Sequence, residues 1–271
     1  MIEVTTAQMY GWIATFLWPM FRMLGLISSA PLLSESTIPR RLKILLAAAL
    51  SVVISPTIGN IPTVPVYSLD GLLIVLNEVG IGLSMGFAMR LVFAAVQMAG
   101  EVIGLQMGLS FASFYDRAAG GQTMVLSRFL NMVAMLLFLA LDGHLMMLAA
   151  LIDSFQGLPI SGVPLSGHGW GVLARAGSMI FSAGTLLSLP MIAALLTMNL
   201  AMGILNRASP QLSIFAVGFP VTLLGGMLVL ALVMPHMGAY MQHLIESGLQ
   251  TAATVLDQLA PYTPVVDLTG K

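Results

Sequence analysis

Charged side chains are scarce in this chain. They make up 8% of its 271 residues, whereas about a quarter of a typical soluble domain is charged. So few charges cannot cover the surface of a soluble globule, and a hydrophobic content of 58% excludes a disordered chain. An ordinary cytosolic enzyme is therefore excluded, and the composition predicts an all-α membrane protein.

Cysteine is absent, and basic residues are few and scattered. Without cysteine there is no disulfide framework, no thiolate metal site and no cysteine nucleophile. The ten lysines and arginines form no basic stripe, so we expect no nucleic-acid partner. None of them precedes Arg22, and a cleavable signal peptide needs a positive start, so none is predicted.

Motifs for catalysis and cofactor binding are missing as well. The sequence contains no Walker loop, no HExxH and no nucleophile elbow. Asp142 and His144 are two residues apart and point to different sides of a helix. His236 and His243 share a face but lack a further ligand for a shared metal. We therefore predict no enzyme activity, no catalytic residue, no metal and no cofactor.

Six apolar stretches approach the length of about 20 residues that crosses a bilayer as a helix. They cover residues 10–33, 44–61, 72–98, 129–152, 176–205 and 212–241. Pro190 and Pro220 lie inside the last two stretches and indicate bends. The sequence thus predicts about six long hydrophobic helices, several of them kinked, arranged as hairpins.

Basic residues in the connections predict an orientation. Arg40, Arg41 and Lys43 place the first connection on the cytoplasmic side, and Arg207 does the same for the fifth. Arg175 in the fourth connection opposes this scheme. The simplest interpretation is six spans with both termini outside.

Glycines recur at four-residue spacing in and after the third stretch. Gly82 and Gly86 form one pair, and Gly100, Gly104 and Gly108 form a longer series. Such spacing lines one helix face with small residues and lets another backbone approach closely. The contact could lie within the chain or with another subunit, although glycine is also common in membrane helices generally.

A polar stripe follows the first glycine pair. Arg90, Gln97 and Glu101 fall within about 20° of one line along a helix. A charge facing the middle of a bilayer costs at least ~2.5 kcal/mol, so the stripe must face a partner, a cavity or the interface. A transporter would use it for ions or protons. We favour the alternative, a structural contact with a neighbouring helix or subunit.

The segment 104–122 is apolar, aromatic and glycine-rich at once. A solvated loop would carry more charge. Irregular backbone at membrane depth is tolerated only where protein or a water-filled cavity surrounds it. We expect the segment to be buried inside an assembly, where its glycines would let it move. The alternative is an interfacial re-entrant segment without a gating role.

Several short motifs, weak singly, occur in a characteristic order over residues 10–248. They are SAPL at 29–32, IPRRLK at 38–43, EVGIGLSMG at 78–86, QMAGE at 97–101, GLQMG at 104–108, LDGH at 141–144, DSF at 153–155 and NRASPQL at 206–212, with Phe215 and VGFP at 217–220. Together they resemble the FliR/SctT family, the export-gate subunits of flagella and injectisomes, and overall similarity favours the flagellar branch. Arg117 stands after Asp116, where the family often has proline.

The resemblance implies a structural and gating subunit of the flagellar type III protein export channel. Such chains lie in the bacterial inner membrane at the flagellar basal body and pack with FliP-type and FliQ-type subunits into a helical hetero-oligomer, which an FlhB-type subunit joins. The assembly of such chains stands largely above the membrane plane, and unfolded flagellar proteins pass through its pore. Residues 1–170 would be the FliP-like portion, residues 171–248 the FliQ-like hairpin and residues 249–271 a polar tail.

The resemblance also assigns the segment 104–122 to the pore plug. An apolar constriction excludes water and ions by dewetting, and the candidate sealing side chains are Met107, Phe111, Phe114 and Tyr115. The candidate hinge and helix-packing glycines are Gly100, Gly104, Gly108, Gly120 and Gly121, and the candidate buried polar contacts are Arg90, Gln97 and Glu101. The alternative function is a small-solute or ion transporter, although we find no convincing internal repeat of the kind that transporters show.

Overall fold

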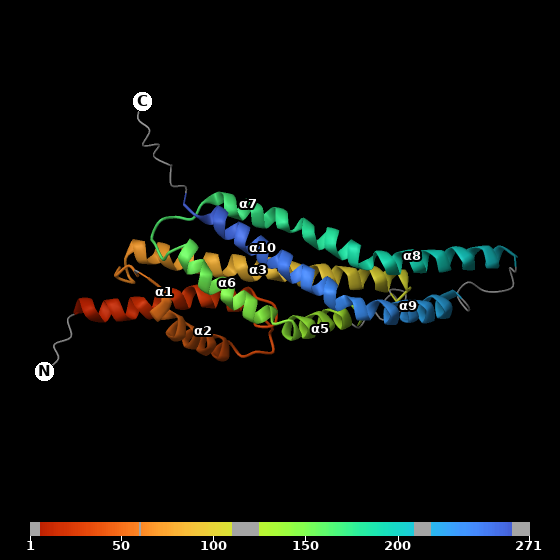
Figure 1. The fold of residues 1–271 in the computed structure, drawn as a ribbon, viewed down its shortest axis with the longest axis horizontal. Helices are drawn as coiled ribbons and strands as arrows, with labels where there is room; N and C mark the ends of the chain where they lie inside the picture. The colour runs from red at the N-terminus through yellow and green to blue at the C-terminus, as the bar shows by residue number, and fades with distance from the viewer. Residues whose placement is uncertain (1–5, 60, 110–124, 209–217, 262–271) are drawn as a thin grey trace, which may run out of the picture. The chain divides into compact units, whose positions relative to one another are not determined.

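The computed structural model of the chain describes residues 6–59, 61–109, 125–208 and 218–261. Across these residues the regular elements are helical, without a strand, which confirms the expected all-α fold. The helices are α1 (Thr6–Ser29), α2 (Arg40–Ile54), α3 (Leu69–Gln106), α5 (Val125–Ala140), α6 (Gly143–Gly157), α7 (Gly167–Ala176), α8 (Ser178–Ala208), α9 (Phe219–Val233) and α10 (Met237–Leu259), with 3₁₀ turns at Ser55–Thr57 and Met234–His236 (Figure 1).

Three helical segments of the described chain are long and apolar enough to cross a membrane. They are Leu69–Gln106, Gly167–Ala208 and Phe219–Leu259, and α5 with α6 would make a fourth if joined across their break. All six apolar stretches contain helix, but fewer than six qualify as spans. The reason is that α2 has only 15 residues, and that polar residues, Arg22 among them, make α1 less apolar.

The fourth apolar stretch is broken, where the sequence predicted one continuous helix. Asp142 has φ 56°, a left-handed conformation that interrupts a right-handed helix. A Cβ on the next residue, Gly143, would collide with the ring of Phe138. Because apolar residues continue on both sides, the break depends on local backbone geometry that hydropathy does not report.

The chain divides into two compact units. Unit 1 comprises residues 1–90, 144–176 and 248–271, and unit 2 comprises residues 91–143 and 177–247. Two of the boundaries fall well inside α3 and α10, so each of these helices contributes to both units. The sequence predicted a different division, into residues 1–170, 171–248 and 249–271, by resemblance to other export subunits. That division stays a prediction, because the two compact units do not test it.

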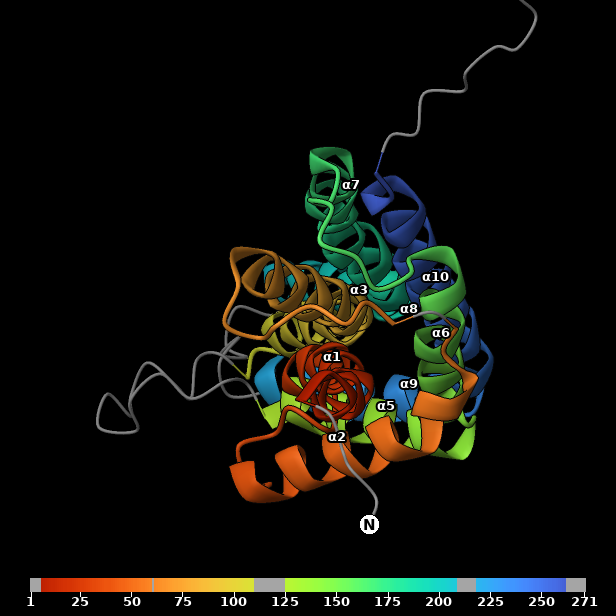
Figure 2. The ribbon, with the colours of Figure 1, turned by 90° about the vertical axis from the view of Figure 1, so that its left-hand side faces the viewer.

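Helix α1 lies between α2 and the first part of α3 in unit 1 (Figure 2). Glycine allows the close approach of α1 and α3. A Cβ on Gly82 would collide with the carbonyl oxygen of Arg22, and one on Gly25 would lie 2.6 Å from the carbonyl oxygen of Val79. A Cβ on Gly86 would collide with the hydroxyl of Ser29 and lie 3.0 Å from the carbonyl oxygen of Leu26. The contact predicted for the Gly82 and Gly86 pair is therefore made within the chain, by two helix backbones.

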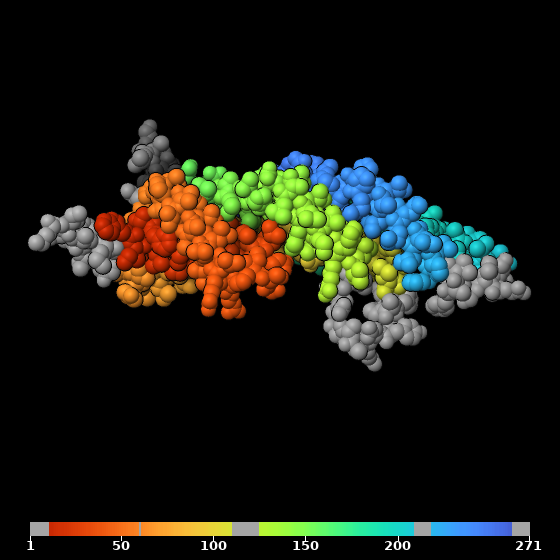
Figure 3. All heavy atoms as spheres, turned by 90° about the horizontal axis from the view of Figure 1, so that it is seen from below, coloured from red at the N-terminus to blue at the C-terminus, as the bar shows by residue number. Residues whose placement is uncertain are grey.

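Helix α2 and the 3₁₀ turn that follows it are attached to α1 by hydroxyl groups. The Ser51 hydroxyl donates to the carbonyl oxygen of Phe16 at 2.6 Å, and the Ser55 hydroxyl donates to that of Thr15 at 3.2 Å. The buried residues of α2 are Ala47, Ser51 and Ile54. Most of the helix therefore remains uncovered, and Figure 3 shows it in red-orange at the surface.

In unit 2 the second part of α3 packs against α5 and α8, again through small residues. A Cβ on Gly100 would lie 2.5 Å from Cα of Ser127 in α5. A Cβ on Gly184 in α8 would lie 2.8 Å from the carbonyl oxygen of Ala95. Helices in lipid gain little from hydrophobic association, so close backbone packing of this kind is what holds them together.

Helix α10 extends beyond the point at which the sequence predicted a polar tail. It continues to Leu259, and Val255 and Leu259 are fully buried in unit 1. The backbone N–H of Ser166 donates to the carbonyl oxygen of Leu259 at 3.0 Å. Residues 249–259 are therefore part of the packed unit, while residues 262–271 lie outside the described residues.

Replacing Gly82 by alanine should loosen the contact between α1 and α3. The added Cβ would collide with helix backbone, which cannot rotate away as a side chain does, and we expect a loss of about 1–3 kcal/mol in stability. The measurement is the thermal unfolding midpoint of the detergent-solubilised chain. Gly203→Ala in α8 is the matched control, because nothing lies within 4 Å of its added Cβ. Equal midpoints for the two variants would contradict the contact.

Candidate functional site

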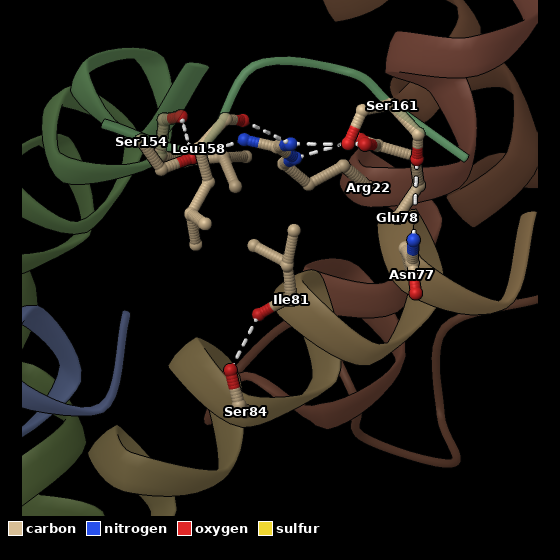
Figure 4. Close-up of polar contacts among 9 residues, drawn as sticks. Arg22, Asn77, Glu78, Ile81, Ser84, Ser154, Leu158 and Ser161 are labelled. Atoms are coloured by element: carbon tan, nitrogen blue, oxygen red, sulfur yellow. Dashed lines mark hydrogen bonds and ion pairs between the residues drawn. The ribbon is translucent and has the colours of Figure 1, made fainter. Parts of the chain in front are cut away.

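An arginine and a glutamate form a buried ion pair in unit 1 (Figure 4). Arg22 of α1 is 0% exposed and Glu78 of α3 is 1% exposed. The Arg22 Nε donates to Oε2 of Glu78 at 2.7 Å, and Nη2 donates to Oε1 at 3.0 Å. Two parallel bonds between a guanidinium and a carboxylate give a strong and geometrically specific interaction.

The guanidinium of Arg22 also contacts the end of α6. Nη1 donates to the hydroxyl of Ser154 at 2.9 Å, and Nη2 donates to the carbonyl oxygen of Leu158 at 2.8 Å. The ring of Phe155 lies with its centroid 4.0 Å from Cζ of Arg22, a distance at which the ring face attracts a cation. One side chain therefore joins three helices, and we call Arg22, Glu78, Ser154 and Phe155 the arginine cluster.

The connection after α6 is fixed beside the arginine cluster. The side-chain amide of Asn77 donates to the carbonyl oxygens of Ser161 at 3.2 Å and Val163 at 2.8 Å. The carbonyl oxygens of this irregular connection are not paired in a helix or a sheet, so the buried amide supplies hydrogen bonds that they would otherwise lack. The cluster and this amide together make the first part of α3 the organising element of unit 1.

Sequence reasoning missed this pairing. Arg22 and Glu78 were visible as single charges inside apolar stretches, but they are 56 residues apart, so no helical spacing connects them. The sequence signal that could have revealed the pair is that each charge stands alone in an apolar stretch. A charge inside an apolar stretch needs a partner, and these two have opposite signs.

Helix α3 ends in a glycine cap. Gly108 has φ 80°, the left-handed conformation that glycine adopts without strain. The N–H of Leu109 donates to the carbonyl oxygen of Gly104 at 3.0 Å, and the N–H of Gly108 donates to that of Leu105 at 3.1 Å. This bond pair is a Schellman motif. Two of the predicted hinge glycines thus terminate α3, and Gly100 packs against α5; hinge motion stays a prediction.

Among the candidate sealing residues, the structure describes Met107. Its side chain is 1% exposed, and a Cβ on Gly226 of α9 would lie 2.7 Å from its Cγ. In the isolated chain Met107 therefore packs inside unit 2, and its sealing role stays a prediction. Phe111, Phe114, Tyr115, Gly120 and Gly121 lie outside the described residues.

The predicted polar contacts all lie on α3. Arg90, Gln97 and Glu101 are exposed in the isolated chain. For Arg90 and Glu101, no side-chain hydrogen bond or ion pair is formed within the part of the chain that the structure describes. Their burial would therefore need another subunit, and it stays a prediction.

Helices α8 and α9 carry an apolar surface that the chain does not cover. The most apolar windows of Gly167–Ala208 and Phe219–Leu259 are each 22% buried, against 72% for that of α3. The large side chains on this surface that are more than half exposed are Phe181, Leu186, Leu196, Leu200 and Ile204 of α8 and Leu224, Met227, Leu228 and Leu232 of α9. We call these residues the hairpin surface. An apolar surface of this extent marks contact with lipid or with other protein.

The described residues contain no group of three His, Asp or Glu side chains that could hold a metal ion. The arrangement offers a buried ion-paired core in unit 1, a capped helix end at Gly108 and a large exposed apolar surface in unit 2. These are features of a component that packs in an assembly.

Comparison with known proteins identifies the family. Residues 13–248 match the family described as bacterial export proteins, family 1. The chain belongs to this family. The flagellar biosynthetic protein FliR of Pectobacterium carotovorum subsp. carotovorum is 45% identical over 96% of this chain and 99% of the relative. FliR of Escherichia coli K12 is 44% identical with the same coverage. FliR of Bacillus subtilis 168 is 27% identical over 89% of this export-family chain and 94% of the relative.

Breaking the arginine cluster from one side should cost more than removing both charges. Glu78→Gln leaves the charge of Arg22 buried and uncompensated, and we expect a loss of about 3–5 kcal/mol. The double variant Arg22→Met/Glu78→Leu removes both charges together and should recover most of that loss, because apolar replacements of a buried pair are often neutral.

The stability of the single and the double variant is measured as the unfolding midpoint in detergent, with Glu101→Gln as the control. Glu101 is exposed, so its change should stay within about 0.5 kcal/mol of the parent chain. A Glu78→Gln variant as stable as the parent, or a double variant no better than the single one, would refute the role given to the cluster.

Proposed function

We propose that this chain is a structural and gating subunit of the flagellar type III protein export channel, through which unfolded flagellar proteins leave the cell. The observation that carries the proposal is the near full-length match to FliR proteins, at 45% and 44% identity over 99% of each relative. The role is non-enzymatic. The rival interpretation, a small-solute or ion transporter, receives no support from the comparisons.

The hairpin surface supports a place in a hetero-oligomer. A chain that leaves so much of α8 and α9 bare needs other helices or lipid to cover them. FliP-type and FliQ-type subunits are the partners that we propose, joined by an FlhB-type subunit. In this arrangement residues 171–248 act as a FliQ-like hairpin and residues 1–170 as a FliP-like portion, in the bacterial inner membrane at the flagellar basal body.

The polar stripe on α3 belongs to the same proposal. Arg90, Gln97 and Glu101 are exposed on a helix whose most apolar window is otherwise mostly buried. Side chains of this kind cannot face hydrocarbon cheaply. We assign them to contacts with a neighbouring subunit.

The segment 104–122 is proposed as the plug of the channel. Its support is the composition, which is apolar and aromatic with glycines at both ends, and the Schellman cap that ends α3 at Gly108. A capped helix end gives the segment a fixed starting point. Apolar side chains could then seal the pore by excluding water, while substrates in transit are unfolded chains.

A charge on the hairpin surface should prevent assembly. Leu200→Glu in α8 places a carboxylate on a side chain that is 67% exposed and that the proposal covers with protein. Burial of an unpaired charge costs several kcal/mol, so the amounts of FliP-type and FliQ-type subunits that co-purify with the tagged chain should fall at least ~10-fold. Secretion of flagellar proteins by a strain that carries only this variant should fall with them.

Tyr67→Glu is the matched control, because Tyr67 is 94% exposed in the connection before α3 and should tolerate the same charge. Two outcomes would overturn the proposal. One is normal co-purification and secretion with Leu200→Glu. The other is normal secretion by a strain that lacks the chain altogether.

Deleting residues 109–118 should leave the complex assembled but leaky. The deletion removes proposed sealing side chains and spares the helices, so co-purification of the partner subunits should stay normal. Ion conductance across the membrane should rise, measured as faster loss of membrane potential in cells that express the complex. Normal assembly with background conductance would pass the sealing role to another subunit.

A further inference from the structure

The first turn of α2 concentrates positive charge. Arg40, Arg41 and Lys43 lie within four residues, and no further charged residue follows until Asp70. Glu35 is the one acidic residue between positions 31 and 59. Arg40 and Arg41 are exposed, and Lys43 Nζ donates to the backbone carbonyl oxygen of Glu35 at 3.0 Å. The start of α2 is therefore a cationic patch on the surface of unit 1.

The rest of α2 presents an aliphatic outer face. The exposed large side chains are Leu42, Ile44, Leu45, Leu46, Val52 and Val53. Beyond Lys43 the helix has a single polar side chain, Ser51, and its hydroxyl is buried and donates inward to Phe16. The outer face thus changes from cationic at its first turn to wholly apolar along the remainder.

An open groove runs beside this face. It has a volume of about 390 Å³, within the range of ~300–1,000 Å³ that small-molecule sites occupy. Its lining includes Ile27, Leu33 and Ile38 from outside α2 and Leu42 and Leu46 of α2, and Lys43 is its one charged lining residue. The groove is therefore almost wholly apolar, and Lys43 of the cationic patch lies at its lining.

We propose that this groove binds an anionic phospholipid, with the phosphate at Arg40, Arg41 and Lys43 and an acyl chain along the aliphatic wall. Charge complementarity selects the anionic headgroup, since basic residues next to an apolar segment attract negatively charged lipid. Length agrees as well. The 15 residues of α2 extend over ~22 Å, enough to pass through one leaflet of a hydrocarbon core that is ~30 Å thick in all.

A lipid accounts for both parts of this face. The cationic first turn matches an anionic headgroup, and after Lys43 the outer face of α2 offers no side-chain donor or acceptor for a hydrogen bond. A hydrocarbon chain needs none. The proposal requires only that the chain lies in a membrane, so it can fail without affecting the export role, and the reverse also holds.

The test is native mass spectrometry of the full chain and of its complex with FliP-type and FliQ-type subunits, each titrated with phosphatidylglycerol or phosphatidylcholine. The parent chain should bind phosphatidylglycerol at least about tenfold more tightly than it binds phosphatidylcholine. The variant Arg40→Gln/Arg41→Gln/Lys43→Gln should lose that preference and keep its unfolding midpoint, because all three changes are at the surface. Ala49→Phe, at another residue that lines the groove, should weaken retention of both lipids.

A single-charge comparison controls for nonspecific attraction. Arg41→Gln should weaken phosphatidylglycerol retention, whereas Arg207→Gln, an exposed charge at the end of α8, should not. Equal retention of the two lipids by the parent chain, or full retention by the triple variant, would overturn the proposal. So would retention by the free chain that disappears in the complex, since a partner protein would then be the occupant of the groove.

Discussion

The bidentate contact between Arg22 and Glu78 is the interaction on which unit 1 depends. Helix α1 is not apolar enough to qualify as a membrane span, and it carries a full positive charge at a position with no exposure. That charge is tolerable only because a carboxylate of α3, a hydroxyl and a carbonyl of α6 and the ring of Phe155 surround it. The contact therefore specifies which helices meet and at which level along their axes.

Glycine makes this geometry possible. Gly82 is one helical turn from Glu78, and the backbone of α1 approaches there closely enough to exclude any Cβ. Close approach and ion pairing support each other, because the guanidinium reaches its carboxylate only when the two helices touch. In unit 2, Gly100 and Gly184 also allow two helix backbones to approach closely, but the atoms that an added Cβ would meet there belong to uncharged residues. Close backbone contacts thus help to hold an interior that buried apolar side chains fill, while α2, α8 and α9 also carry many exposed apolar side chains.

This arrangement suits a chain that acts through its contacts with lipid or with other subunits. Polar groups inside unit 1 hold one arrangement of helices, and the outward apolar side chains provide contact area for lipid or other subunits. Membership of the export family, near full-length similarity to FliR proteins and the bare hairpin surface all agree with a component that acts by assembling.

Composition and spacing predicted the class of fold and some of its contacts. Sparse charge led to an all-α membrane protein, and the four-residue spacing of Gly82 and Gly86 led to a close helix contact. The partner of that contact could not be predicted, since α1 and α3 have no periodic relation. The break at Asp142 was missed because a single left-handed residue leaves hydropathy unchanged. The pairing of Arg22 with Glu78 was missed because long-range electrostatic contacts leave no local pattern, and most of the proposed plug residues lie outside the described residues.

The separation of the two charges along the chain has a consequence for biosynthesis. Glu78 follows Arg22 by 56 residues, so at about 5–20 residues per second a ribosome adds it roughly 3–11 s later. Ser154 follows by 132 residues, which corresponds to roughly 7–26 s at the same speed. Throughout this interval the nascent α1 holds an uncompensated guanidinium that hydrocarbon rejects. The core of unit 1 can therefore close only after α3 and α6 have been made, and the order of synthesis sets the order in which its helices can pack.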